Sequence, residues 1–140
     1  MDWKLELMVL PVSDVDRAKD FYADKLGFNV DVDHSAGDAF RVVQLTPPGS
    51  ACSISVGKGL TESTPGSVQG MHLVVADIEK ARSQLVERGV EASEIFHFGA
   101  NGRASGPHPE HGDYESFVSF SDPDGNGWVV QEVRRGVTPA

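Results

Sequence analysis

Cysteine, long apolar runs and clustered positive charge are all scarce in this chain of 140 residues. Cys52 is the one cysteine, which excludes an intrachain disulfide and a Cys-x-x-Cys metal or redox site. No apolar run approaches the length of a membrane-spanning helix. The first residues carry neither a basic stretch nor a long apolar segment of the kind found in signal peptides, so we expect a cytoplasmic protein.

Acidic residues outnumber basic ones, 21 to 12, which gives a formal net charge of −9. A field of this sign repels phosphate backbones and anionic membranes, so we expect neither nucleic acid nor a membrane as a partner. Apolar content of 39% and charged content of 24% are ordinary for one globular domain. Fifteen glycines and eight prolines indicate many turns and therefore a sheet-rich fold.

Two stretches of the chain have nearly the same sequence pattern. Residues 14–19 read Asp-Val-Asp-Arg-Ala-Lys, and residues 77–82 read Asp-Ile-Glu-Lys-Ala-Arg. Each follows an apolar, strand-like run and leads through further apolar positions to a glycine, Gly27 or Gly89. The acid that opens each stretch is typical of a helix N-cap, and the glycine is typical of a helix end. The repeat predicts a duplicated supersecondary unit.

Each copy predicts a β-α-β-β-β module within one domain. Module one spans about residues 4–57, a linker about 58–67 and module two about 68–135, within a domain of residues 1–136 and before a tail at 137–140. The expected helices cover residues 14–27 and 77–88, and the expected strands cover residues 5–12, 28–32, 40–45, 51–56, 68–75, 90–98, 114–120 and 128–133.

The connection over residues 99–113 is long for a compact domain, which is typical of a lid or binding loop. It contains His108, Glu110 and His111 among prolines. Prolines favour an extended chain, in which adjacent side chains point in different directions, so one metal ion would not easily collect all three. The sequence therefore predicts a solvated loop.

Several of these motifs together resemble the vicinal oxygen chelate superfamily, which includes glyoxalases, bleomycin-resistance proteins, fosfomycin-resistance enzymes and extradiol dioxygenases. The shared features are Asp14 at a helix start, aromatic residues 21–22 before Leu-Gly-Phe at 26–28, and the turn Asp-Pro-Asp-Gly-Asn at 122–126. The resemblance implies an α+β fold in which two modules form a curved, eight-stranded mixed sheet. This sheet would make a cup with helices on its outside, and such proteins are often homodimers.

The resemblance also implies where a metal ion would sit. In metal-binding relatives the first strand of a module carries a histidine seven residues before the helix-starting aspartate, and these positions here are Leu7 and Gly70. The other ligands are carboxylates in the last strand of each module. The matching candidates are Ser53 or Ser55 in module one and Val129 in module two. Because Leu, Gly and Val side chains offer no donor atom, we expect the metal site to be lost and predict no cofactor.

The register of the last strand stays open at this point. A bulge at residues 127–128 would move the ligand position from Val129 to Gln131 or, less easily, to Glu132. If a metal ion were bound, its ligands would be His72, Gln131 and Glu132.

His72 is expected on the inner face of the cup. Strand side chains alternate, so Leu7 and Val9 share a face, and the matching pair in module two is Gly70 and His72. One interpretation of His72 is a half-buried side chain that is hydrogen-bonded to a neighbour. The other is a pocket group that anchors a ligand or acts as a catalytic acid or base.

The primary hypothesis is a metal-free homodimer that binds a small, apolar or aromatic molecule. Aromatic side chains of the last two strands, among them Phe117 and Trp128, would stack on a flat ligand where they face the cup. The cup could form within one chain or across the dimer. The expected ligand-binding residues are Leu7, Val9, Ser53, Ser55, His72, Trp128 and Gln131.

Two enzymatic alternatives remain. One is a metal-dependent lyase, isomerase or dioxygenase with a rearranged site built from His72, Gln131 or Glu132. The other uses His72 as a general base in a non-redox reaction without metal.

Overall fold

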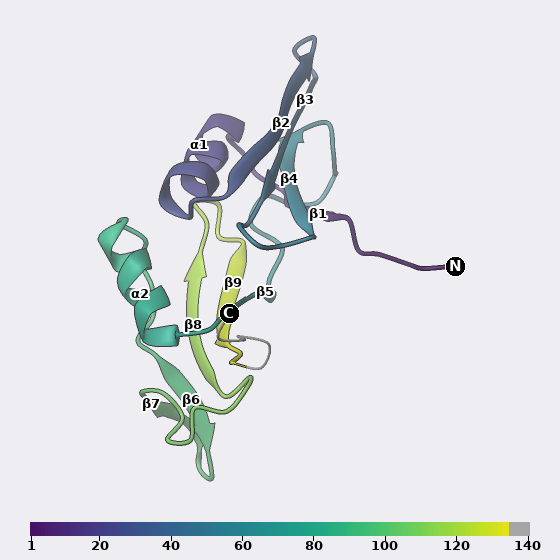
Figure 1. Ribbon diagram of the computed structural model, residues 1–140. Coiled ribbons are helices and arrows are strands. Elements are labelled where there is room, and N and C mark those ends of the chain that lie inside the picture. The colour runs from purple at the N-terminus through teal and green to yellow at the C-terminus, as the bar shows by residue number, and fades with distance from the viewer. Residues whose placement is uncertain (135–140) are drawn as a thin grey trace. The chain divides into compact units, whose positions relative to one another are not determined.

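The chain folds as two compact units, which the computed structural model describes over residues 1–134 (Figure 1). Unit 1 comprises Met1–Val68 together with Asp122–Asn126, and unit 2 comprises Gln69–Ser121 and the residues from Gly127 on. The expected α+β class and the duplicated plan are confirmed, because each unit has its own mixed sheet and its own helix. The predicted tail at residues 137–140 and the predicted end of module two at residue 135 lie outside the described residues.

Unit 1 follows the predicted order of one strand, a helix and three strands. Its sheet has the strand order β1-β4-β3-β2, in which β1 and β4 are parallel and the other pairs are antiparallel. The elements are β1 (Leu7–Val9), α1 (Val15–Asp20) with the π-helical turn η1 (Phe21–Lys25), β2 (Asn29–Ala36), β3 (Phe40–Thr46) and β4 (Ser53–Lys58).

Unit 2 repeats this plan and adds one strand. Its sheet has the order β5-β9-β8-β6-β7, again with the first pair parallel and the others antiparallel. The elements are β5 (Met71–Val75), α2 (Ile78–Glu87), β6 (Phe96–Gly99), β7 (Gly102–Ser105), β8 (Ser116–Ser121) and β9 (Gly127–Glu132).

The two repeated stretches start their helices as the sequence predicts. The Asp14 carboxylate accepts a hydrogen bond from the Arg17 N–H at 3.0 Å, and the Asp77 carboxylate accepts one from the Lys80 N–H at the same distance. Each bond satisfies an N–H group that has no partner within its helix. Gly27 has a φ of 76°, in the left-handed region where glycine ends a helix most easily.

The strand count differs from the expected eight because residues 99–113 are not all loop. Gly99 pairs with Gly102, and a tight hairpin joins β6 to β7. Gly102 has a φ of 98°, which a side chain would make unfavourable. The dipeptide Asn101-Gly102 is a strong hairpin signal that the sequence interpretation overlooked. The first strand of this hairpin, β6, begins at Phe96, whereas the sequence predicted a strand from residue 90. Residues 90–95 are therefore not part of β6.

In unit 1, α1 covers one face of the sheet. The Arg41 side chain of β3 reaches Asp16 of α1 at 2.7 Å, so the face that contains Arg41 is turned toward the helix. Alternate residues of β3 and β4 on this same face form the core: Val43, Leu45, Ile54 and Val56. The opposite face is called the helix-free face of unit 1.

Unit 2 has the same two-sided construction. Glu132 of β9 accepts a hydrogen bond from the N–H of Ile78, the first residue of α2, so the face that contains Glu132 is turned toward α2. Its buried apolar residues are Val118, Phe120, Trp128 and Val130. The opposite face is called the helix-free face of unit 2.

The turn between β8 and β9 belongs to unit 1. Asp122 accepts hydrogen bonds from three backbone N–H groups of the turn and from the phenol of Tyr22 at 2.7 Å. The amide of Asn126 donates to the Pro11 carbonyl at 2.9 Å and accepts from the Val68 N–H at 3.1 Å. The motif therefore forms the turn that its sequence predicts and also fixes three segments of unit 1.

Among the described residues, no helix is both long enough and apolar enough to cross a membrane.

Candidate functional site

The residues that match family metal positions in unit 1 lie on its helix-free face. Leu7 pairs with Ser53 and Val9 with Ser55, so all four side chains share one side of the parallel β1–β4 pair. Gln44 of β3 pairs with Ser55 and therefore lies on this face too. Two apolar walls and two hydroxyl groups are thus brought together as the sequence predicted. None of these four is a strong metal ligand.

The hydroxyl of Ser53 is already engaged within the sheet. It lies 2.6 Å from the hydroxyl of Thr46 and 3.5 Å from the amide nitrogen of Gln44. Both Ser53 and Ser55 are buried. A ligand on this face would therefore meet a small polar network whose hydroxyl orientations are partly fixed.

The corresponding face of unit 2 brings together His72 and Gln131. His72 pairs with Val129, and Val74 pairs with Gln131, so these four side chains lie on the helix-free face. His72 and Val74 are exposed, the latter by 61%. Strand β9 pairs without a register shift, so the bulge considered at residues 127–128 is absent and Val129 occupies the expected ligand position.

The orientation of His72 follows from a hydrogen bond to its own strand. Its Nδ1 lies 2.6 Å from the carbonyl oxygen of Gly70. Because a carbonyl oxygen can only accept, Nδ1 carries the proton. In the neutral ring Nε2 then keeps its lone pair and can accept a hydrogen bond from a ligand hydroxyl or amide.

Trp128 and Glu132 are not on this face, which corrects two sequence-based expectations. Strict alternation from Gln131 places both on the side that α2 covers. Trp128 is buried and stacks on Phe120 at a centroid distance of 6.1 Å. Trp128 is thus a core residue and does not line a ligand surface with Gln131.

Glu132 is occupied by structural partners. Its side chain is 1% exposed, and its oxygens lie 3.0 Å from the Ile78 N–H, 3.1 Å from His111 Nδ1 and 3.4 Å from an Arg134 nitrogen. A metal site made from His72, Gln131 and Glu132 would need donor atoms from both faces of one sheet. The structure therefore contradicts that donor set.

An aromatic cluster extends the helix-free face of unit 2. Phe117 of β8 pairs with Gln131 on one side and with Phe96 of β6 on the other. The rings of Phe96 and Phe117 stack at 5.5 Å, and the ring of Phe98 meets Phe117 edge-to-face at 5.6 Å. The guanidinium of Arg103 lies 3.7 Å above the centroid of Phe96. Phe98 is nevertheless 59% exposed.

The sequence interpretation included Phe117 but missed Phe96, Phe98 and Arg103. Phe96 and Phe98 alternate around His97, which is the period of a strand with one apolar face. The signal was therefore present. The position of Phe96 next to Phe117 depends on the pairing of β6 with β8, which the sequence does not specify.

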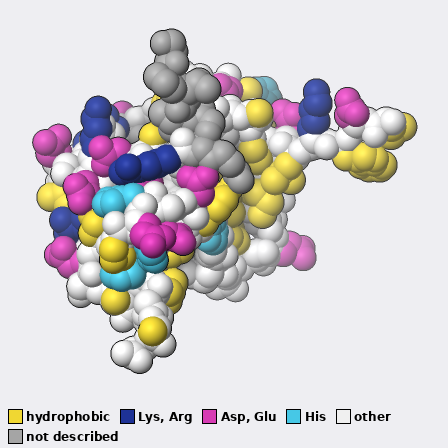
Figure 2. Space-filling view, turned by 60° about the horizontal axis from the view of Figure 1, so that its bottom comes forward, with side chains coloured by type: hydrophobic (Ala, Val, Ile, Leu, Met, Phe, Trp, Pro, Cys, Tyr) yellow, Lys and Arg dark blue, Asp and Glu magenta, His cyan; other side chains and the backbone are white. Residues whose placement is uncertain are grey.

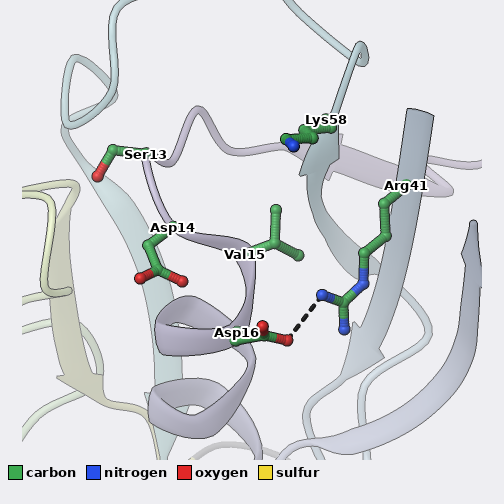
Figure 3. Close-up of a pocket in the computed structure, with 6 residues that line it drawn as sticks. All are labelled: Ser13, Asp14, Val15, Asp16, Arg41 and Lys58. Carbon is green, nitrogen blue, oxygen red and sulfur yellow. Dashed lines mark hydrogen bonds and ion pairs between the residues drawn. The ribbon is translucent and has the colours of Figure 1, made fainter. Parts of the chain in front are cut away.

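A hollow of about 300 Å³ lies at the start of α1 (Figure 3). Its charged lining residues are Asp14, Asp16, Arg41 and Lys58. Asp14 caps α1, and Arg41 binds both Asp16 and Asp33. A similar hollow of about 330 Å³ lies at the start of α2. These charges serve the fold, so we place no functional site there.

The ion pairs of Asp33 with Lys19 and Arg41, next to the first hollow, predict how the stability of the protein changes with pH. The guanidinium of Arg41 and the ammonium of Lys19 hold the pKa of Asp33 well below its usual range. We expect Asp33→Asn to lower the free energy of unfolding by about 1 kcal/mol near pH 7, a modest value because these side chains are partly solvated.

The sign of the pH dependence follows from the lowered pKa. The contribution of Asp33 is complete above the unfolded-state pKa of about 3.9 and is lost as the pH falls through the lower folded-state value. Urea unfolding of both proteins should show their difference shrinking from about pH 4 toward about pH 2. A difference that stays constant over this range would contradict the assignment.

Comparison with known proteins places the fold in a family. Residues 4–130 match the Glyoxalase/Bleomycin resistance protein/Dioxygenase superfamily. Among solved structures, TnmS3, an antibiotic binding protein from Streptomyces sp. CB03234, is 30% identical with a TM-score of 0.73, and the match covers 94% of this chain and 97% of that one.

Two further structures agree. A glyoxalase/bleomycin resistance protein from the same Streptomyces strain is 30% identical over 92% of this chain and 100% of its own, with a TM-score of 0.70. A superfamily member from Sphaerobacter thermophilus DSM 20745 is 29% identical over 94% of this chain and 98% of its own, with a TM-score of 0.72. No curated protein matches. The match over residues 4–130 and the shared fold show that this chain belongs to the Glyoxalase/Bleomycin resistance protein/Dioxygenase superfamily.

Proposed function

We propose that the chain binds a small, flat, aromatic or apolar molecule on the helix-free face of unit 2, without a metal ion in the position usual for the superfamily. The observation that carries the proposal is the cluster of Phe96, Phe98 and Phe117 next to Gln131, on the face of the sheet that also contains His72. Apolar surfaces with few polar anchors are typical of small-molecule sites.

The aromatic cluster is suited to stacking. Phe98 keeps 59% of its surface exposed although a monomer gains by burying such a ring. Phe117 supports it edge-to-face, and the Arg103 guanidinium lies over the ring of the neighbouring Phe96. A planar ligand that covered Phe98 would bury apolar area on a support that is already ordered, so little conformational entropy would be lost.

Polar groups at the edge of this surface would orient the ligand. Val74 and Val129 form an apolar strip, and His72 and Gln131 lie beside it on the same face. Nε2 of His72 would accept a hydrogen bond, and the amide of Gln131 can donate or accept one. Considered by itself, the helix-free face of unit 1 has a separate set of proposed ligand contacts, which are Leu7, Val9, Ser53 and Ser55.

The positions that hold metal in related proteins support a metal-free site here. Leu7, Gly70 and Val129 have no donor atoms, and the remaining serines are weak ligands. A transition-metal site usually needs three protein donors. The proposed binding therefore relies on stacking, burial and hydrogen bonds.

The relative TnmS3 is described as an antibiotic binding protein. Its identity of 30% over 94% of this chain supports a small-molecule ligand for this chain. A metal-dependent lyase, isomerase or dioxygenase remains the alternative, but its donor set of His72, Gln131 and Glu132 is split between two faces of the sheet. Catalysis by His72 as a general base remains a hypothesis, and a pH-independent rate between about pH 5 and 8 would argue against it. The cytoplasmic location and the homodimer stay predictions.

Titration of the purified protein with planar aromatic compounds, such as naphthalene, acridine and flavone derivatives, tests the proposal by calorimetry. We expect at least one to bind, and we expect Phe98→Ala to weaken its affinity at least tenfold, or about 1.4 kcal/mol, because the exposed stacking ring is lost. Phe40→Ala is the matched control, since Phe40 is also an exposed phenylalanine but lies on β3 of unit 1. Equal affinities of the two variants would contradict the assignment of this face.

A further inference from the structure

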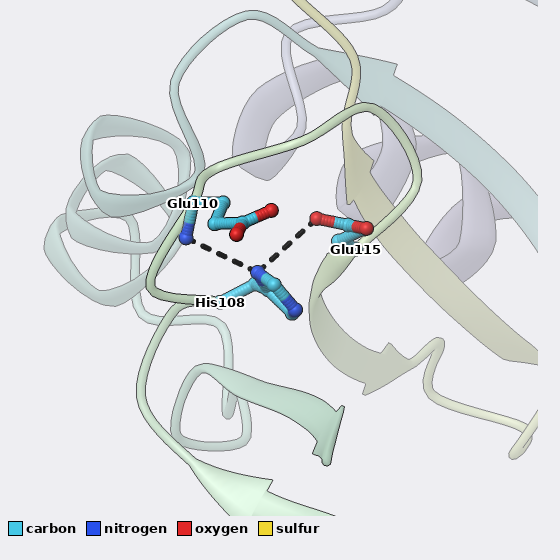
Figure 4. Close-up of side chains that lie close together, drawn as sticks. All are labelled: His108, Glu110 and Glu115. Atoms are coloured by element: carbon cyan, nitrogen blue, oxygen red, sulfur yellow. Dashed lines mark hydrogen bonds and ion pairs between the residues drawn. The ribbon is translucent and has the colours of Figure 1, made fainter. Parts of the chain in front are cut away.

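Three side chains with metal-binding atoms converge in the segment between β7 and β8. His108, Glu110 and Glu115 each offer one donor atom, and these atoms all lie within 4.8 Å of one another (Figure 4). Figure 2, which turns the bottom of the Figure 1 view forward, shows histidine and acidic side chains gathered on that face. The sequence analysis considered His108, Glu110 and His111 together. In the structure the third member of the group is Glu115 and not His111.

This segment lies on the side of unit 2 opposite the proposed ligand surface. His111 reaches Glu132, whose side chain is on the α2 side of the sheet. The backbone N–H of His108 donates to the hydroxyl of Ser116 at 2.9 Å, and Ser116 shares the buried face of Val118. The cluster is therefore separate from Phe98, His72 and Gln131.

The hydrogen bonds of His108 leave an unbalanced contact. Its Nδ1 accepts the backbone N–H of Glu110 at 3.1 Å, which requires a lone pair on that nitrogen. A carboxylate oxygen of Glu115 lies 3.1 Å from the same nitrogen. This nitrogen has one lone pair, so its contact with Glu115 either opposes two acceptors or needs a proton on Nδ1 that displaces the Glu110 N–H. A cation bound to Nδ1 would also take the place of the Glu110 N–H, and it would join the imidazole and the Glu115 carboxylate on one ion.

The distances suit a single small ion. Zn²⁺ binds imidazole nitrogen and carboxylate oxygen at about 2.0–2.2 Å, so two ligands of a tetrahedral ion lie about 3.3 Å apart. The observed separation of 3.1 Å between Nδ1 and the Glu115 oxygen is close to this value. No described residue makes a hydrogen bond or ion pair with the Glu110 carboxylate, so this side chain can close on the ion by rotation.

Backbone contacts hold the first two ligands in place. The N–H of Gly112 donates to the Glu115 carboxylate at 3.2 Å, and the N–H of His111 donates to the His108 carbonyl at 2.9 Å. Together with the bond to Ser116, these contacts fix both ends of the segment. Such outer contacts orient the ligands of a metal ion.

We propose that His108, Glu110 and Glu115 bind one divalent transition-metal ion of the Zn²⁺ class, with water completing its coordination. One imidazole and two carboxylates are a usual donor set for this ion. The site uses none of the positions that hold metal in related proteins. A metal ion at this site would join His108 and Glu110, in the segment before β8, to Glu115, directly before the first residue of that strand.

Calorimetric titration of chelator-treated, untagged protein with ZnCl₂ tests the proposal. We expect about one equivalent to bind, and Glu115→Gln to weaken Zn²⁺ affinity at least about tenfold, because a carboxylate ligand becomes a neutral amide. Glu110→Gln should do the same. Since the Glu110 carboxylate has no partner among the described residues, its replacement leaves the fold's own contacts intact.

Two matched controls carry the same changes at exposed sites, Glu91→Gln and His34→Gln. Both should bind Zn²⁺ like the unmodified chain. The proposal is overturned if the unmodified chain binds no Zn²⁺, if both cluster variants keep its affinity, or if the controls lose affinity equally.

Discussion

Replacing Asp122 by alanine is expected to lower the free energy of unfolding by about 3–5 kcal/mol. The carboxylate accepts three backbone N–H groups, the Tyr22 phenol at 2.7 Å and the Asn126 amide at 2.8 Å. Asp122, Tyr22 and Asn126 are all buried, so water cannot replace the lost acceptor. The loss is large because several donors would remain unsatisfied at once.

Urea unfolding of graded variants separates this network from a general effect of lost charge. Asp122→Asn keeps one acceptor oxygen and should lose about half as much stability, and Tyr22→Phe, which removes one bond, about 1–2 kcal/mol. Asp38→Ala is the control, because Asp38 is an exposed turn residue and its change should stay within about 0.5 kcal/mol. If Asp122→Ala and Asp38→Ala were equally stable, the turn would not fix unit 1.

Replacing Glu132 by alanine is the second large effect, with an expected loss of about 2–4 kcal/mol. Its buried carboxylate accepts the first N–H of α2 and faces His111 and Arg134. Removing it leaves the Ile78 N–H without its acceptor beneath the helix. His111 and Arg134 are partly exposed and can be solvated, which keeps the loss below that expected for Asp122.

Glu132→Gln retains an oxygen for the Ile78 N–H and should lose only about half as much stability. Glu87→Ala, at an exposed position of the same helix, serves as the control. A Glu132→Ala protein as stable as the control would contradict the structural role assigned to Glu132.

The repeat made the fold predictable. Asp14 and Asp77 cap helices by local hydrogen bonds, and local bonds depend on residues a few positions apart. The turn at residues 122–126 was predictable for the same reason, since it also depends on residues a few positions apart. Its Gly125 has a φ of 101°. Strand β7 was missed although Asn101-Gly102 indicated it, because the long polar segment was interpreted as one loop.

The candidate site was only partly predictable because it depends on pairing between distant strands. The shared face of Leu7, Val9, Ser53 and Ser55 followed from strand alternation alone. The position of Trp128 required the register of β9, and the group of Phe96, Phe98 and Phe117 required the contact between β6 and β8. Neither is encoded within a few residues of the side chains concerned.

The central claim is that a small aromatic molecule binds without a metal ion. Its most direct test is calorimetric titration of the Glu115→Gln protein with the aromatic compound that binds most tightly, before and after treatment with a chelator. This variant removes a ligand of the proposed metal cluster, so that site binds metal more weakly and has less influence on the result. We predict about one equivalent bound with the same Kd in both samples. Binding that disappears with the chelator and returns with a divalent metal ion would contradict the claim.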